Sequence, residues 1–131
     1  QQMREMGVRL KLNAVAEVVR GKRLIMIDDS IVRGTTSKKI VQMLRNVGAQ
    51  EVHMVVSSPP TQFPCYYGID TSRREELIAR TMDVDQIGQY IGADSLHYIS
   101  RAGMFKALGS EAGIFCDACF CGEYPAGAEG K

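Results

Sequence analysis

The chain has 131 residues, of which 45% are hydrophobic and 24% are charged, a composition that can bury the core of one folded domain and argues against wholesale disorder. Its 16 basic and 15 acidic side chains leave a formal net charge of +1, so nothing in the charge points to nucleic acid or an anionic membrane as a partner. The sequence has no apolar run of the roughly 18 residues that a membrane span needs, and no signal-peptide pattern, so we expect a cytoplasmic protein.

The N-terminal half of the chain predicts a strand–helix–strand unit. The continuous apolar run LIMI, residues 24–27, is typical of a buried parallel strand. Apolar residues at helical spacing follow over 40–47, and Gly48 supplies the usual C-terminal stop. A second strand is predicted over 51–58, ahead of two prolines. These elements indicate a βαβ unit, in which the two strands are parallel.

The remaining elements follow from the same patterns. They are a half-exposed strand over 8–12, helices over 14–19, 75–80, 84–91 and 102–108, and a short strand over 96–99. Together they favour an α/β fold with an open, mainly parallel sheet flanked by helices. We expect residues 1–109 to form this part and residues 110–131 to form a C-terminal cysteine-containing segment. Because the chain begins at Gln1 and ends in a Gly- and Ala-rich tail, we also expect it to be part of a longer polypeptide.

The loop after the first predicted strand carries the strongest functional signal. Asp28 and Asp29 follow the strand directly, at the end where ligands bind in parallel sheets. Adjacent carboxylates suit ribose hydroxyls or a magnesium-bound sugar diphosphate. Gly34 then permits close backbone approach, and the Thr-Thr-Ser run offers hydroxyls near free N–H groups at a helix start, where Thr36 or Ser37 is the predicted N-cap. Each feature alone is common in ordinary loops, but their combination at this position favours a phosphate site.

Sequence motifs along nearly the whole chain carry a family resemblance. LIMIDDSIVRGTTS resembles the phosphoribosylpyrophosphate-binding signature of type I phosphoribosyltransferases. Together with GAQEVHMVVSSPP, FPCYYGIDT, IGADSL and CDACFCGEYP in that order, it is similar to the amidophosphoribosyltransferase family. The resemblance implies the C-terminal part of a type I phosphoribosyltransferase domain. It also implies formation of 5-phosphoribosylamine from phosphoribosylpyrophosphate and glutamine-derived ammonia, the first step of de novo purine biosynthesis.

The same resemblance assigns roles to residues. Asp28 and Asp29 are expected to bind the ribose and Mg²⁺, and Lys11 to lie near the pyrophosphate, although a solvated lysine is the simpler interpretation of Lys11 by itself. The segment expected to wrap the 5′-phosphate consists of Ser30, Ile31, Val32, Arg33, Gly34, Thr35, Thr36 and Ser37. Purine nucleotides as feedback inhibitors and a homotetramer are implied as well. Since the glutaminase domain of the family has no counterpart here, we expect this chain alone to lack glutaminase activity and to have little transferase activity.

Three of the four cysteines suggest a metal site. The spacing Cys116-x-x-Cys119 suits a metal or a cluster, and Cys65 could join from a distant loop. With Cys121 as a fourth ligand, the residues alone also allow a zinc site. The resemblance implies a structural 4Fe–4S cluster held by Cys65, Cys116 and Cys119, with a fourth cysteine upstream of Gln1. Cys121 departs from the family pattern, and a small buried residue is the favoured interpretation over a ligand.

Two other functions compete with the enzyme. One is a non-catalytic module of phosphoribosyltransferase fold that senses phosphoribosylpyrophosphate or a nucleotide, which would share the acidic loop but would not need the cysteines. The other is a zinc-stabilised salvage phosphoribosyltransferase. Iron with acid-labile sulfide at the cysteines would favour the amidophosphoribosyltransferase.

Overall fold

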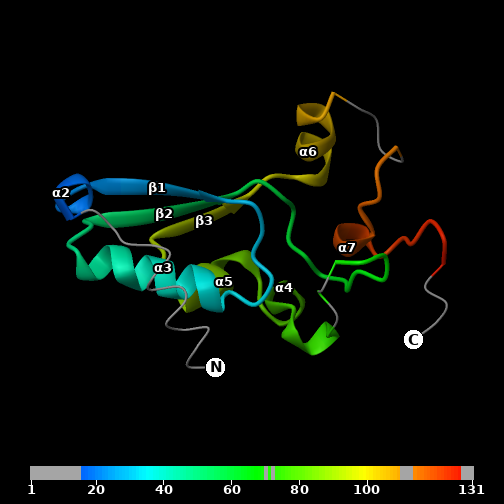
Figure 1. The fold of residues 1–131 in the computed structure, drawn as a ribbon, viewed down its shortest axis with the longest axis horizontal. Helices are drawn as coiled ribbons and strands as arrows, with labels where there is room; N and C mark the ends of the chain where they lie inside the picture. The colour runs from blue at the N-terminus through cyan, green and yellow to red at the C-terminus, as the bar shows by residue number, and fades with distance from the viewer. Residues whose placement is uncertain (1–15, 70, 72, 110–113, 128–131) are drawn as a thin grey trace.

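The computed structural model of this chain describes residues 16–69, 71, 73–109 and 114–127 (Figure 1). The strand predicted over 8–12 and Lys11 lie outside the described residues. The elements, in chain order, are α2 (Ala16–Val19), β1 (Arg23–Asp28), α3 (Thr35–Asn46), β2 (Glu51–Val56), the 3-10 helix η1 (Arg74–Glu76), α4 (Ile78–Thr81), α5 (Val84–Ile91), β3 (Ser95–Tyr98), α6 (Arg101–Ala107) and α7 (Ala118–Cys121). In the part of the chain that the structure describes, no helix is long and apolar enough to cross a membrane.

The three strands form one parallel sheet in the order β1-β2-β3, so the predicted α/β fold with a parallel sheet is confirmed. Arg23 of β1 is in register with Glu51 of β2, and His53 of β2 with Ser95 of β3. Helices α3, α4 and α5 lie on the same side of the sheet in Figure 1, and α7 lies apart from it beside the segment that follows β2. The carboxyl ends of the strands therefore share one edge, at which a ligand can bind.

The core lies between the sheet and the helices on that side. Val52, Met54 and Val56 of β2 are fully buried and alternate with half-buried residues, as expected of a central strand. Ile87 and Ile91 of α5 are each 1% exposed and belong with Met54 and Val56 to the same buried cluster. This packing fixes the sheet edge relative to the helices.

Strand β1 is not buried on both faces, so the burial predicted for LIMI is wrong. Ile25 and Ile27 are 70% and 74% exposed, whereas Leu24 and Met26 are half-buried. Within the described residues, β1 is an edge strand, and the helices that pack on the sheet cover the face carrying Met26. A continuous apolar run predicts a strand, but its burial depends on what the rest of the polypeptide places over each face.

Several boundaries also differ from prediction. Helix α3 begins at Thr35, and its N-cap is Gly34 without a side-chain hydrogen bond, so the N-cap predicted at Thr36 or Ser37 is wrong. The helix predicted over 75–80 is divided into η1 and α4, because Leu77 adopts an extended conformation. Strand β2 ends two residues early, β3 and α6 are shifted by one residue, and α7 was not predicted. Helix α5 has the predicted bounds.

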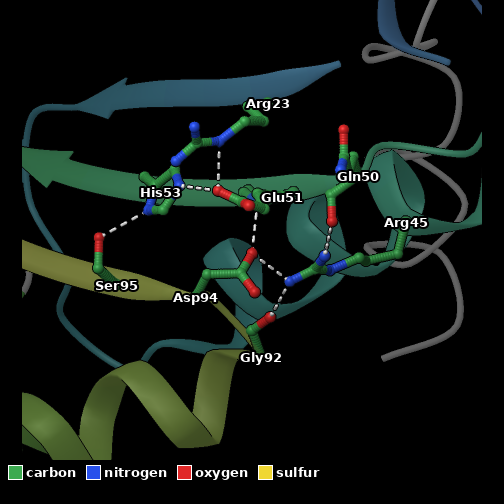
Figure 2. A network of polar contacts seen from close by, with 9 residues as sticks. Arg23, Arg45, Gln50, Glu51, His53, Gly92, Asp94 and Ser95 are labelled. Carbon is green, nitrogen blue, oxygen red and sulfur yellow. Dashed lines mark hydrogen bonds and ion pairs between the residues drawn. The ribbon is translucent and has the colours of Figure 1, made fainter. Parts of the chain in front are cut away.

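A polar network ties the amino ends of the strands together (Figure 2). Arg23 Nε and His53 Nε2 both contact Glu51 Oε2, at 2.6 and 2.8 Å, and His53 Nδ1 lies 2.9 Å from Ser95 Oγ. Hydrogen bonds from Arg23 and His53 hold the pKa of Glu51 below its usual value, with the His53 bond the larger cause. The contacts join all three strands at the end of the sheet opposite the acidic loop.

Asp94, just before β3, accepts a hydrogen bond from the backbone N–H of Val52 at 2.6 Å. Its carboxylate also forms an ion pair with the Arg45 guanidinium (Figure 2). The backbone hydrogen bond is the main reason that the pKa of Asp94 is lowered. A lowered pKa means that the carboxylate stabilises the fold above its unfolded pKa and that this contribution is lost as the pH falls below about 4.

Substituting Asp94→Asn should therefore lower the free energy of unfolding at pH 7 by about 1 kcal/mol, and should flatten the dependence of that free energy on pH below about 4. Urea unfolding at several pH values measures both effects. Glu75→Gln removes one negative charge from an exposed side chain and serves as the control. Equal effects of the two substitutions would contradict the role given to Asp94.

Candidate functional site

The acidic pair lies at the carboxyl end of β1. Asp28 is the last residue of the strand, and its carbonyl oxygen accepts a hydrogen bond of 3.0 Å from the Ser57 N–H after β2. Its carboxylate accepts from the Asp29 N–H at 3.0 Å, and the Asp29 carboxylate accepts from Ser30 Oγ at 3.1 Å. A backbone N–H therefore orients the Asp28 carboxylate and a side-chain hydroxyl the Asp29 carboxylate, and both lie at the sheet edge where a ligand can reach them.

A cavity of about 250 Å³ lies between this pair and the start of α3. It is lined by Asp28, Asp29, Ser30, Ile31, Val32, Arg33, Gly34, Thr35, Thr36 and Ser37. The structure thus brings together every predicted substrate-binding residue except Lys11, which lies outside the described residues. A single continuous segment supplies the whole lining, which is why a sequence motif could predict it.

The end of the cavity at α3 suits an anion. Gly34 takes a left-handed conformation with φ of 72° and turns the chain into the helix. The first N–H groups of a helix have no acceptor within the helix, and in the described residues no side chain caps this end. These N–H groups and the positive end of the helix dipole favour a phosphate at this point. Ser37, only 3% exposed, lies on the inner side of this first turn.

Residues from α4 and α5 support the loop from behind. A Cβ built on Gly34 would lie 2.9 Å from Ile78 Cδ1 and 3.1 Å from Tyr90 Cε1, so only glycine fits without movement. The Ile78 N–H donates to the Val32 carbonyl at 2.9 Å, and Ile31 is buried in the core. The shape of the loop is therefore fixed by packing before any ligand binds.

Arg33 has an acidic partner that sequence reasoning did not find. Its guanidinium forms an ion pair with Glu76 of η1, 43 positions along the chain. The side chain, which belongs to the segment expected to wrap the 5′-phosphate, is thus held by a carboxylate beside the loop. No local sequence signal links positions so far apart, so only the fold reveals this contact.

The second candidate site contains the cysteines. Cys65, Cys119 and Cys121 are half-buried and Cys116 is exposed, and all four are free thiols. Burial raises the pKa of Cys119 to about 11, with smaller contributions from Cys65 and Cys116 in the same direction. The N–H groups of Gln62 and Phe63 donate to the Cys119 carbonyl oxygen at 3.0 Å, so the chain just before Cys65 lies against the segment that carries Cys119. Metal binding at Cys119 would have to displace a proton, since the thiolate is the ligand.

A single-ion cage is not formed by these residues. Within residues 16–69, 71, 73–109 and 114–127, no group of three or more His, Cys, Asp or Glu side chains is arranged to hold one metal ion. The Cys121 sulfur is engaged elsewhere, lying 3.5 Å from the Asp117 carbonyl oxygen and accepting a hydrogen bond of 3.4 Å from the Glu123 N–H. Asp117 is 7% exposed and is paired with Arg101, a contact that raises the pKa of Arg101.

Comparison with known proteins places these sites in context. No family model matches the chain. Amidophosphoribosyltransferase of Bacillus subtilis is 57% identical over 130 residues, and that of Synechococcus elongatus is 55% identical over 125 residues, each match covering 95% of this chain. The Archaeoglobus fulgidus amidophosphoribosyltransferase is 51% identical over 133 residues and covers all of it. The chain spans 25–29% of the length of these curated relatives.

Solved structures give the same result. The glutamine phosphoribosylpyrophosphate amidotransferase from Bacillus subtilis, complexed with ADP and GMP, matches 95% of this chain with a TM-score of 0.83 and 56% identity. A structure described as the allosteric regulatory enzyme of purine biosynthesis matches the same share with a TM-score of 0.82 and 56% identity. This chain covers 28% of each.

Proposed function

Because this chain is related over 95% of its length to one part of the amidophosphoribosyltransferases, we propose that it is the phosphoribosylpyrophosphate-binding part of such an enzyme. The observation that carries the proposal is the cavity formed by residues 28–37, with two carboxylates at one end and a helix N-terminus at the other. A phosphorylated sugar has hydroxyls at one end and a phosphate at the other, and the cavity offers partners for both.

The 5′-phosphate binds at the start of α3 in this proposal. The N–H groups after Gly34 donate to the phosphate oxygens, and the hydroxyls of Thr35 and Thr36 add further donors. The carboxylates of Asp28 and Asp29 accept hydrogen bonds from the ribose hydroxyls or hold Mg²⁺ against them. Binding at both ends fixes the sugar relative to the sheet edge and thereby orients its C1 atom.

The reaction then consists mainly of positioning and charge stabilisation. Ammonia displaces pyrophosphate at C1, and the negative field of Asp28 and Asp29 stabilises the positive charge that develops on the sugar. Bound Mg²⁺ would neutralise charge on the departing pyrophosphate. No covalent nucleophile is needed from this chain. Since the relatives are about four times longer, we place the release of ammonia from glutamine outside this chain, and expect the chain alone to have little transferase activity.

For the cysteines, we propose a 4Fe–4S cluster held by Cys65, Cys116 and Cys119. The backbone hydrogen bonds from Gln62 and Phe63 to the Cys119 carbonyl oxygen bring the Cys65 segment against the Cys116-x-x-Cys119 segment, which supports one metal group shared by both, and cysteine thiolates are the usual ligands of an iron–sulfur cluster. Iron with acid-labile sulfide in the purified protein is the expected result, and zinc without sulfide would overturn this assignment.

Regulation by nucleotides is part of the same proposal. The similar structure from Bacillus subtilis is complexed with ADP and GMP, which supports purine nucleotides as inhibitors of this protein. A homotetramer and a cytoplasmic location remain predictions. The alternative function, a non-catalytic module that senses phosphoribosylpyrophosphate, would use the same cavity but gives no reason for three neighbouring cysteines.

Ligand binding to the described loop tests the proposal. Phosphoribosylpyrophosphate with Mg²⁺, added to ¹⁵N-labelled chain, should shift the amide resonances of Gly34, Thr35, Thr36 and Ser37, because their N–H groups would face the phosphate. Inorganic phosphate should shift the same resonances at higher concentration, and ribose without phosphate should not. Shifts confined to other parts of the chain would contradict the proposed site.

A further inference from the structure

Two segments far apart in the sequence meet around the cysteines. In Figure 1, α7 and the chain after it lie beside the segment that follows β2, away from the sheet. The backbone N–H groups of Gln62 and Phe63 both donate to the Cys119 carbonyl oxygen, each at 3.0 Å. The approach is close, since a Cβ on Gly122 would lie 2.9 Å from the Phe63 ring. These contacts involve no cysteine sulfur.

Tyrosines join the same two segments. The Tyr66 and Tyr124 rings lie 4.8 Å apart between centroids, and Tyr67 meets Tyr124 edge-on at 6.1 Å. Tyr124 donates its hydroxyl to the Pro64 carbonyl at 2.6 Å. The Tyr67 hydroxyl donates to the Gly127 carbonyl at 3.1 Å and accepts from the Ala126 N–H at 3.0 Å.

We propose that Tyr67 and Tyr124 are positioning residues that hold the Cys65 loop against the Cys116–Cys119 segment before any metal group binds. Tyr67 and Tyr124 each follow a proposed ligand closely in the chain, and their hydroxyls reach the opposite segment. The inference rests on the proposed role of Cys65, Cys116 and Cys119 as cluster ligands. It assigns to these tyrosines the role of holding the two cysteine-bearing segments together.

The physical basis is preorganisation. Bringing two distant segments together costs conformational entropy, and a metal group that had to do so alone would bind more weakly by that amount. Three tyrosine hydrogen bonds and two backbone hydrogen bonds to Cys119 join the two segments without using a cysteine sulfur, so they can hold the segments together independently of a metal group. The entropy cost of joining the segments is therefore not subtracted from the binding free energy of the cluster, and the cluster binds more tightly.

The test compares Tyr67→Phe and Tyr124→Phe with a matched control, Tyr66→Phe. Each substitution removes one hydroxyl and keeps the ring, but the Tyr66 hydroxyl makes no hydrogen bond within the described part of the chain. The full chain is reconstituted anaerobically with Fe²⁺, sulfide and a small thiol. An iron chelator is then added, and the rate at which the cluster is lost is measured from the decrease of the cluster's charge-transfer absorption. In the metal-free chain, amide hydrogen exchange at Phe63 reports whether the two segments stay docked.

We expect Tyr67→Phe and Tyr124→Phe to lose the cluster about 10-fold faster than the unmodified chain and to exchange the Phe63 amide faster, with far-UV circular dichroism unchanged. Tyr66→Phe should match the unmodified chain in all three measurements. Equal loss rates in all three variants would overturn the inference while leaving the cluster in place. An unmodified chain that takes up no iron or sulfide would overturn the cysteine site itself, and the inference with it.

Discussion

Replacing Asp28 and Asp29 together by asparagine is expected to weaken binding of magnesium-bound phosphoribosylpyrophosphate by at least about 100-fold, because two charge-assisted interactions of about 1.5–3 kcal/mol each are lost. The carboxylates line the cavity, and asparagine keeps their size and part of their hydrogen bonding. Two adjacent negative charges repel each other, so the double substitution should leave the free energy of unfolding unchanged or slightly raised. A loss of binding at unchanged stability would identify the pair as ligand-binding rather than structural.

Isothermal titration calorimetry with and without Mg²⁺ separates the two roles of the pair. The unmodified chain should bind much more weakly once Mg²⁺ is removed, and the doubly substituted chain should be insensitive to Mg²⁺. Asp85→Asn, which makes the same chemical change on the exposed side of α5, is the control and should bind as the unmodified chain does. Full Mg²⁺-dependent binding by the doubly substituted chain would remove the acidic pair from the site.

Substituting Gly34→Ala should have the second-largest effect, because it combines backbone strain with a steric clash. A φ of 72° costs an alanine about 1–2 kcal/mol, and the new Cβ would meet Ile78 and Tyr90 at 2.9 and 3.1 Å. Displacing these packed side chains adds about 1–3 kcal/mol. The loop would shift away from the position in which its N–H groups face a phosphate, so ribose 5-phosphate binding should fall at least about 10-fold.

Gly21→Ala is a matched control for this substitution. Gly21 has nearly the same φ, 70°, but among the described residues no atom beyond its chain neighbours lies within 4 Å of the place its Cβ would occupy. In urea unfolding, Gly21→Ala should lower the free energy of unfolding only by the cost of backbone strain. It should not change ribose 5-phosphate binding. If Gly34→Ala and Gly21→Ala lower the free energy of unfolding equally and neither affects binding, the packing behind the loop has no functional role.

The sequence predicted elements whose signals are local. Helix α5 has the predicted bounds because its ends carry their own signals: Asp83 and Gln86 form a capping box, and Gly92 ends the helix with a positive φ. The start of α3 was misplaced because its cap is a glycine rather than a hydroxyl side chain. The exposure of Ile25 and Ile27 depends on what lies over that face, which a strand's own residues do not encode.

The two sites differ in predictability for the same reason. The cavity is lined by one continuous segment, so a motif in that segment predicted its residues together. The contacts that hold the loop, such as the ion pair between Arg33 and Glu76, join residues far apart in the sequence and have no local signal. Likewise, the spacing of Cys116 and Cys119 suggested a metal site, whereas the hydrogen bond of Tyr124 to Pro64, 60 positions away, required the fold.

A segment exchange tests the central claim most directly. The corresponding segment of the Bacillus subtilis amidophosphoribosyltransferase, 57% identical over 130 residues, is replaced by this chain, and formation of phosphoribosylamine from phosphoribosylpyrophosphate is measured. The account predicts an active hybrid that loses this activity when Asp28 and Asp29 are replaced by asparagine. A hybrid that folds and assembles like its parent but forms no phosphoribosylamine, or one whose activity survives both substitutions, would contradict it.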